Sequence, residues 1–161
     1  MLLESAARVL QDNRDVGVYV GIGAMTSLLL GGIKKNGDSA TSAVYAGTAV
    51  LLSVASGRIS FMRGLTGPCL ALDTACCSSL VATHLARSGL ERIECTQALS
   101  SGVGILEEMV FAAFSAAGML SPLGRCHTFD IRADGYCRGE SVASFLLRDL
   151  GHVQIAGSAV Q

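Results

Sequence analysis

The stretch that decides the fold of this chain is Pro68-Cys69-Leu70-Ala71-Leu72-Asp73-Thr74-Ala75-Cys76-Cys77-Ser78-Ser79-Leu80-Val81-Ala82-Thr83-His84. It begins as an apolar run with strand character, and the spacing of its residues changes at Asp73. From Ser78 onward the spacing is helical, with three larger apolar residues on one side, Leu80, Val81 and Leu85. The sequence therefore predicts a strand, a sharp turn of small residues and a helix.

The predicted turn carries thiols. A strand-to-helix corner lifts its side chain clear of the sheet, as in the nucleophile elbows of other α/β enzymes. It also places that side chain at a helix N-terminus, where unpaired N–H groups and the helix dipole favour an anion. For cysteine the anion is the thiolate, which is the reactive species. The alternative is a small buried apolar side chain, the common state of a free cysteine, and for Cys77 we expect that packing role.

The residues of this stretch resemble the active-site segment of β-ketoacyl synthases, in particular the ketosynthase domains of polyketide synthases and related fatty acid synthases. The family pattern is D-T-A-C-S-S-S-L-V-A, and residues 73–82 match it except that Cys77 replaces a serine. Residues 119–140 resemble a second pattern, M-L-S-P-D-G-R-C-K-T-F-D-x-x-A-D-G-Y-x-R-G-E, with Leu123 and His127 as departures.

The resemblance implies a thiolase-like fold, in which two similar α/β halves are stacked. Residues 1–161 look like an N-terminal portion of such a domain, and we expect one half of the fold, an α/β mixed sheet with helices on both faces. The C-terminal half, with the two histidines of the family's Cys-His-His triad, is absent from this sequence. His84, His127 and His152 do not match those motifs, and we expect structural or solvated roles for all three.

The resemblance also implies a function and a set of site residues. Cys76 aligns with the nucleophile, and its backbone N–H would stabilise the oxyanion of a thioester. The expected activity is an acyltransferase that accepts an acyl chain from a carrier protein and condenses it with a malonyl-type extender by decarboxylative Claisen chemistry. We expect an acyl carrier protein as partner, substrates on its phosphopantetheine, no further cofactor, a homodimer in the full-length enzyme and a cytoplasmic or organellar location.

Several charged residues lie within the second matched pattern, residues 119–140, which we expect to form a loop. Asp130, Asp134, Arg138 and Glu140 are predicted to position substrate or brace the loop. Arg58, Arg132 and Arg138 are expected to pair with those carboxylates. A non-catalytic alternative is a thiolase-fold scaffold or an assembly piece of the chain-length-factor type, and the retained Cys76 motif argues against it.

Composition restricts the other function classes. Half of the 161 residues are hydrophobic, 16% are charged and the net charge is -1, which gives no electrostatic case for nucleic-acid binding. The six cysteines include no C-x-x-C pair, and we expect reduced thiols rather than a zinc site. The longest apolar stretch is too short and too interrupted for a membrane span.

Outside the central stretch, apolar periodicity and turn residues predict the other elements. The predicted helices are 2–10 and 107–117; the predicted strands are 16–22, 98–105, 142–147 and 153–159; and 31–42 is a predicted surface loop. Residues 54–61 resemble the family segment that ends A-x-G-R-[IL]-S-[YF], and this resemblance implies a short helix just before the central stretch.

Overall fold

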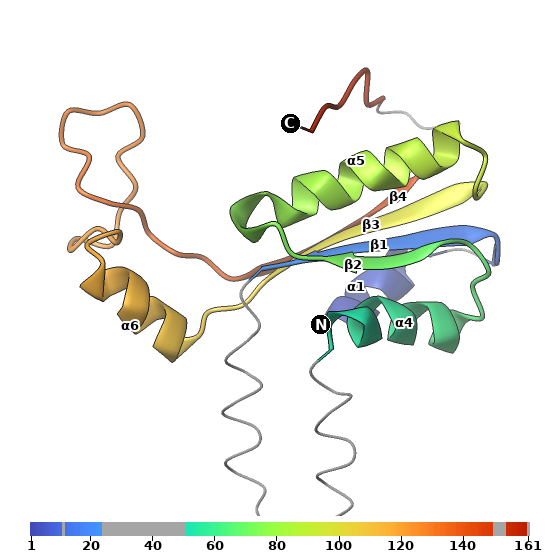
Figure 1. The fold of residues 1–161 in the computed structure, drawn as a ribbon, viewed down its shortest axis with the longest axis horizontal. Coiled ribbons are helices and arrows are strands. Elements are labelled where there is room, and N and C mark those ends of the chain that lie inside the picture. Colours follow the sequence, from blue (N-terminus) through green and yellow to red (C-terminus); the bar gives the residue numbers. More distant parts are fainter. Residues whose placement is uncertain (11, 24–50, 150–153, 161) are drawn as a thin grey trace, which may run out of the picture.

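The fold is built on a mixed four-stranded sheet with the order β2-β1-β3-β4 (Figure 1). The computed structural model describes residues 1–10, 12–23, 51–149 and 154–160. β1 pairs in parallel with β2 and β3, and β4 is antiparallel to β3. The strands are β1 (Val16–Ile22), β2 (Cys69–Leu72), β3 (Gln97–Gly104) and β4 (Ser141–Leu147).

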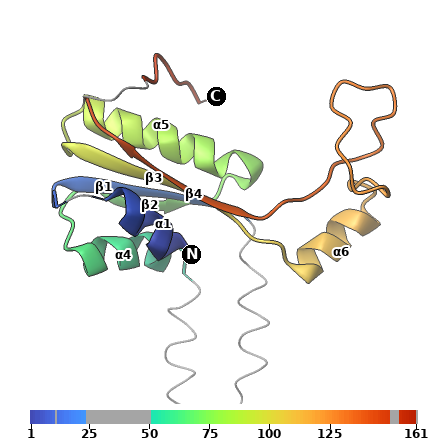
Figure 2. The same ribbon diagram turned by 180° about the vertical axis from the view of Figure 1, so that it is seen from behind.

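The central strand β1 is buried along its whole length, because helices cover both faces of the sheet. α1 (Leu2–Val9) and α4 (Leu52–Arg63) lie on one face, and α5 (Ser78–Glu91) lies on the other (Figure 2). Val18 and Val20 pack in one core cluster with Ile59 of α4. Tyr19, which points to the opposite face, packs with Ala82 of α5. The predicted mixed sheet with helices on both faces is confirmed.

α5 contacts the sheet through small residues. Ala82, Ala86 and Gly89 are buried in that contact. The strand beneath is equally small: a Cβ added to Gly102 would lie 2.7 Å from the Cβ of Ser79. Leu80, one of the three larger apolar residues that the helical spacing placed on one side, is 61% exposed and lies outside this contact. Small side chains allow the helix to approach the sheet closely, and the larger ones are left outside the contact.

One part of the molecule extends beyond the end of the sheet (Figures 1 and 2). It consists of α6 (Glu108–Ala116) and residues 117–140, and we call it the projecting arm. None of the residues of α6 is buried. The helix ends before Gly118, whose φ of +68° suits glycine. A bridge between Leu120 and Tyr136 holds the base of the arm together.

The other predicted elements were mostly correct. The helices expected over 2–10, 54–61 and 107–117 correspond to α1, α4 and α6, and the strand expected over 142–147 is β4. The strand over 153–159 was wrong, since residues 154–160 form no strand. A strand needs a neighbour, and in the part of the chain that is described this run pairs with none. The expected loop 31–42 and His152 lie outside the described residues.

The helices of the described ranges are all too short or too polar to cross a membrane.

Candidate functional site

The turn between β2 and α5 is one turn of 3-10 helix, η1 (Ala75–Cys77), which runs directly into α5. Ser78 is only 4% exposed and points to the inner side of this turn. The Ser78 hydroxyl accepts a hydrogen bond from the Thr74 amide at 2.8 Å and donates one to the Ala75 carbonyl at 2.7 Å. The Ala75 amide donates to Asp73 Oδ1 at 2.8 Å. The predicted strand-turn-helix is therefore confirmed, and its turn is fixed by hydrogen bonds.

The backbone at this corner is unusual. Ala75 has a φ of +54°, in the left-handed region that non-glycine residues rarely adopt. Such a conformation costs about 1–3 kcal/mol and persists where the surroundings impose it. Here the hydrogen bonds of Asp73 and Ser78 impose it, and the next residue, Cys76, is exposed at the tip of the turn.

The two thiols of the turn differ in their contacts. Cys77 donates its backbone N–H to the Thr74 carbonyl at 3.3 Å, and its thiol lies 2.9 Å from the same oxygen. Among the residues that the structure describes, none accepts a hydrogen bond from the Cys76 amide. The prediction of a packing role for Cys77 was wrong, since its side chain is exposed. At this corner Ser78 occupies the inward position instead.

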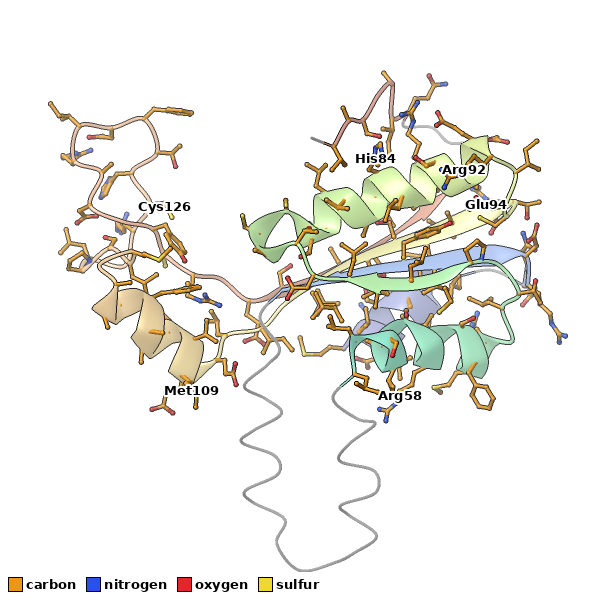
Figure 3. All side chains as sticks on the ribbon, viewed as in Figure 1. Arg58, His84, Arg92, Glu94, Met109 and Cys126 are labelled. Atoms are coloured by element: carbon orange, nitrogen blue, oxygen red, sulfur yellow. The ribbon has the colours of Figure 1, made fainter. Side chains whose placement is uncertain are left out.

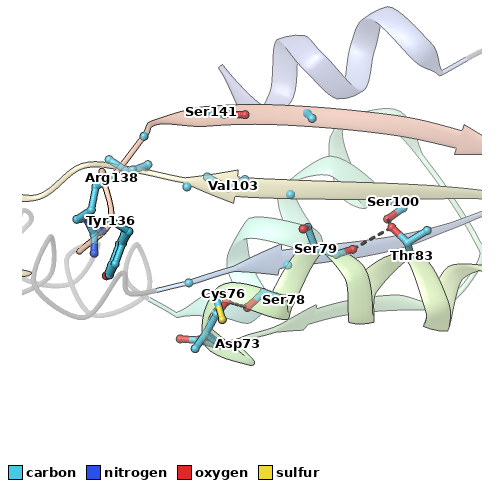
Figure 4. A pocket seen from close by; sticks show the side chains of 18 of the residues that line it. Asp73, Cys76, Ser78, Ser79, Thr83, Ser100, Val103, Tyr136, Arg138 and Ser141 are labelled. Carbon is cyan, nitrogen blue, oxygen red and sulfur yellow. Dashed lines mark hydrogen bonds between the residues drawn. The ribbon is translucent and has the colours of Figure 1, made fainter. Parts of the chain in front are cut away.

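Cys76 lies on an open cleft of about 760 Å³ (Figure 4). Small residues of β3, such as Gly102 and Gly104, form part of its lining. The projecting arm supplies a second, bulkier part of the lining, made of Phe114, Met119, Tyr136, Cys137 and Arg138. The cleft thus joins an exposed thiol to a flat strand surface and an apolar wall.

Arg138 is the one residue of the predicted loop set that lines this cleft. Its guanidinium carbon lies 5.0 Å from the centre of the Phe114 ring, a cation–π distance. Its Nε is buried and has no hydrogen-bond partner among the described residues. Because a buried donor without an acceptor is costly, this atom is available to an acceptor that enters the cleft.

The three carboxylates of the loop set lie outside the cleft lining. Asp130 pairs with Arg132, whose Nε and terminal nitrogen lie 3.0 and 2.8 Å from its two oxygens. This pairing lowers the pKa of Asp130 and raises that of Arg132. Glu140, at the end of the arm, accepts a hydrogen bond at 3.2 Å from the amide of Leu106, which lies just before the arm begins. Asp134 is exposed.

The predicted arginine pairings were therefore only partly correct. Arg132 pairs with Asp130, but in the described ranges neither Arg58 nor Arg138 forms an ion pair with Asp130, Asp134 or Glu140. Arg138 contacts an aromatic ring instead, and Arg58 is exposed on α4. A pattern of charges in sequence does not specify which partners the fold brings within reach.

The two histidines that the structure describes are both away from the cleft lining. His84 lies on α5 (Figure 3). Its Nδ1 is 2.9 Å from the Ser158 hydroxyl oxygen, and this hydrogen bond attaches the C-terminal residues to α5. His127 is half-buried in the arm, and its carbonyl accepts a hydrogen bond from the Asp130 amide. The hydrogen bond of His84 agrees with the structural role predicted for it, and the role of the His127 side chain stays a prediction.

Some residues of the cleft were not singled out from the sequence. Phe114 and Met119 gave no signal beyond the apolar content of a helix and its end. Tyr136 stands within the second matched pattern, and that pattern was the available indication of its place at the site.

A mixed sheet covered by helices on both faces, with an exposed cysteine where a strand turns into a helix, is typical of the thiolase-like class of proteins. The chain belongs to the β-ketoacyl synthase family: the family described as "Beta-ketoacyl synthase, N-terminal domain" matches residues 2–152.

Individual relatives agree with this assignment. The chain is 42% identical over 158 residues to the "Non-reducing polyketide synthase mapC" of Penicillium brevicompactum, covering 92% of the chain and 6% of that protein. It is 40% identical over 148 residues to "Erythronolide synthase EryA2" of Saccharopolyspora erythraea, covering 91% of the chain and 4% of that protein. The chain therefore spans a small part of these relatives.

Solved ketosynthases have the same fold. The "Ketosynthase from module 6 of the bacillaene synthase from Bacillus subtilis 168" superposes with a TM-score of 0.69 at 35% identity. The match covers 92% of this chain and 24% of the ketosynthase. The predicted thiolase-like half is thereby confirmed.

Proposed function

We propose that Cys76 is the nucleophile of a ketosynthase and accepts an acyl chain from a carrier-protein thioester. The observation that carries the proposal is the position of this thiol: it is exposed at a hydrogen-bonded strand-to-helix turn and lines the cleft. Reactive cysteines are partly exposed, and a helix N-terminus is one of the features that favour the thiolate, whereas buried structural cysteines are inert.

The first half-reaction is a thioester exchange. The Cys76 sulfur attacks the acyl carbonyl, a new C–S bond forms, the old C–S bond breaks, and the phosphopantetheine thiol leaves with a proton. The charge that develops on the carbonyl oxygen would be stabilised by the Cys76 amide, for which no internal acceptor exists in the described ranges. A covalent intermediate divides one difficult step into two easier ones.

The second half-reaction would join two carbon units. A malonyl-type extender loses carbon dioxide, the resulting carbanion attacks the acyl carbonyl on Cys76, a C–C bond forms and the thiol is released. In the family two histidines assist this step, and no described histidine of this chain lines the cleft. We therefore propose that the chain is one portion of a condensing enzyme, with the histidines supplied by a second half.

The remaining roles follow the same proposal. Arg138, with its unpaired Nε beside the cleft, would position the substrate, while Asp130, Asp134 and Glu140 would brace the arm. The partner would be an acyl carrier protein in the cytoplasm or an organelle, the full-length enzyme would be a homodimer, and no cofactor beyond the carrier's phosphopantetheine would be needed.

Covalent labelling tests the proposal. The chain is incubated with an acyl thioester or with cerulenin, and the modified residue is identified by mass spectrometry. We expect Cys76→Ala to reduce labelling at least about 100-fold, because the nucleophile is gone. The matched control is Cys77→Ala, which removes the adjacent exposed thiol and should keep labelling within about twofold of the unchanged chain.

Two results would contradict this assignment. Equal labelling of Cys76 and Cys77 would mean that the turn does not select one thiol. Absence of selective labelling in a folded chain would favour the non-catalytic scaffold.

A further inference from the structure

Two cysteines that the proposed reaction does not use lie next to each other in the projecting arm. Cys126 and Cys137 are 11 residues apart, and both are exposed. The Cys126 sulfur accepts a hydrogen bond from the Cys137 amide at 3.1 Å and lies 3.8 Å from the Cys137 carbonyl oxygen. The Cys126 side chain is therefore held against the backbone of Cys137; its place in the arm is seen in Figure 3.

This arrangement is compatible with a covalent bond between the two sulfurs. One N–Cα bond of about 1.5 Å separates the Cys137 amide from its Cα, so the Cys126 sulfur lies within about 4.6 Å of that Cα. Disulfides join residues whose Cα atoms are about 4.4–6.8 Å apart, a range that this contact allows. Among the described residues the Cys137 thiol has one hydrogen-bond contact, at 3.6 Å to the Arg138 carbonyl oxygen, so rotation about its χ1 would turn the sulfur toward Cys126 at little cost.

We propose that Cys126 and Cys137 form a reversible dithiol–disulfide pair, oxidised by low-molecular-weight disulfides such as oxidised glutathione. One thiolate attacks the glutathione disulfide, which gives a mixed disulfide and releases one reduced glutathione. The second thiol then attacks the mixed disulfide, forms the Cys126–Cys137 bond and releases the second reduced glutathione. The protein loses two electrons and two protons, and the glutathione disulfide gains them.

The bond would close a ring over residues 126–137 of the arm. Cys137 also lines the cleft beside Tyr136 and Arg138, so oxidation would covalently fix the wall that faces Cys76. The proposal concerns the chemistry of the arm alone and does not depend on the activity of Cys76.

Tryptic digestion tests it directly. Cleavage after Arg125, Arg132 and Arg138 places Cys126 in peptide 126–132 and Cys137 in peptide 133–138. The whole chain is equilibrated with oxidised and reduced glutathione at about 1 mM in total, alkylated and digested without reduction. Since two thiols joined by a short loop have an effective concentration in the millimolar range or above, we expect the linked pair 126–132/133–138 to exceed either glutathionylated peptide.

The dependence on glutathione gives a second measurement. The fraction of internal disulfide at equilibrium depends on the squared concentration of reduced glutathione divided by the concentration of oxidised glutathione. The fraction of a mixed disulfide depends instead on the simple ratio of the two concentrations. In the Cys137→Ser variant the linked peptide should be absent and Cys126 should carry glutathione; Cys126→Ser should give the converse. Cys77→Ser is the matched control, and it should leave the linked fraction unchanged.

The proposal fails if peptides 126–132 and 133–138 each carry glutathione and stay unlinked in saturating oxidised glutathione. It also fails if both stay unmodified, or if the linked fraction follows the simple ratio.

Discussion

The Tyr19 hydroxyl is a buried polar group that the fold leaves without a partner. Its side chain is 1% exposed, and no described residue forms a hydrogen bond with the hydroxyl oxygen. Burial, together with the nearby Cys95 and Glu94, raises the pKa of Tyr19 to about 12. The neutral form is thus strongly favoured in the folded protein.

Replacing Tyr19 with phenylalanine should change the pH dependence of stability. The pKa of Tyr19 is higher in the folded protein than in the unfolded chain. The contribution of Tyr19 to the free energy of unfolding is therefore complete below the unfolded pKa, about 10, and is lost as the pH rises toward 12. Near neutral pH, Tyr19→Phe should stay within about 1 kcal/mol of the unchanged chain, since the lost hydroxyl had no partner. Above pH of about 10 its free energy of unfolding should fall less steeply.

Urea denaturation at a series of pH values measures both effects. The pKa of Cys95 is also raised by burial, so part of the alkaline loss should remain in Tyr19→Phe. Parallel stability curves for the two proteins would show that Tyr19 is not the group that titrates.

At the scale of elements, the contact between β1 and the start of α5 determines where Cys76 lies. A Cβ added to Gly21 of β1 would overlap the backbone of Ser78 and lie 2.7 Å from the Ser79 amide nitrogen. Backbone atoms cannot move aside as a flexible side chain can. We expect Gly21→Ala to lower the free energy of unfolding by about 1–3 kcal/mol and to slow labelling of Cys76, because α5 must shift.

Gly57→Ala is the matched control for that change. Gly57 lies within α4, and a Cβ there would meet no atom within 4 Å. Since alanine favours helix over glycine, this variant should be more stable by about 0.8–1 kcal/mol and should keep normal labelling. If chemical denaturation found Gly21→Ala as stable as the unchanged chain, the close contact between β1 and α5 would be disproved.

The boundaries of these elements could be predicted because the signals are local. The change of apolar spacing after Asp73 placed the start of α5 at Ser78, where the structure has it. The buried face of α5 could not be predicted from apolar side chains, since close packing on glycine strands favours Ala82 and Ala86 over Leu80. The strand expected over 153–159 failed for a related reason: pairing depends on a distant neighbour.

In the candidate site, too, the features set by neighbouring residues could be predicted from the sequence, and those set by distant contacts could not. Cys76 was identified from one continuous motif, because its turn is built from residues adjacent in sequence. The cleft wall around Phe114 and the pairing of Arg138 depend on where the arm lies relative to the sheet, and no local pattern encodes that placement. For this reason the predicted pairing of Arg138 with a carboxylate was wrong.

For the whole molecule, the distribution of exposed apolar side chains is the main physical constraint. The projecting arm exposes Met109, Phe111 and Met119, Leu106 is exposed just before it, and α6 buries none of its residues. A helix with this composition is stable in water only when it packs against another surface. The chain spans 24% of a solved ketosynthase, so further surface that could cover this helix is present in that relative.

We therefore expect the chain to self-associate when it is studied alone. Sedimentation velocity should give a weight-average coefficient that rises with protein concentration, because apolar surface becomes buried between copies. Met109→Lys with Phe111→Lys should weaken the association at least about tenfold, since charged groups would have to be desolvated in the contact. Met62→Lys introduces the same charge on α4, where Met62 is 66% exposed, and should leave the association nearly unchanged. A monodisperse monomer that unfolds cooperatively would show that the arm is already stable by itself, and an equal effect of Met62→Lys would place the contact on another surface.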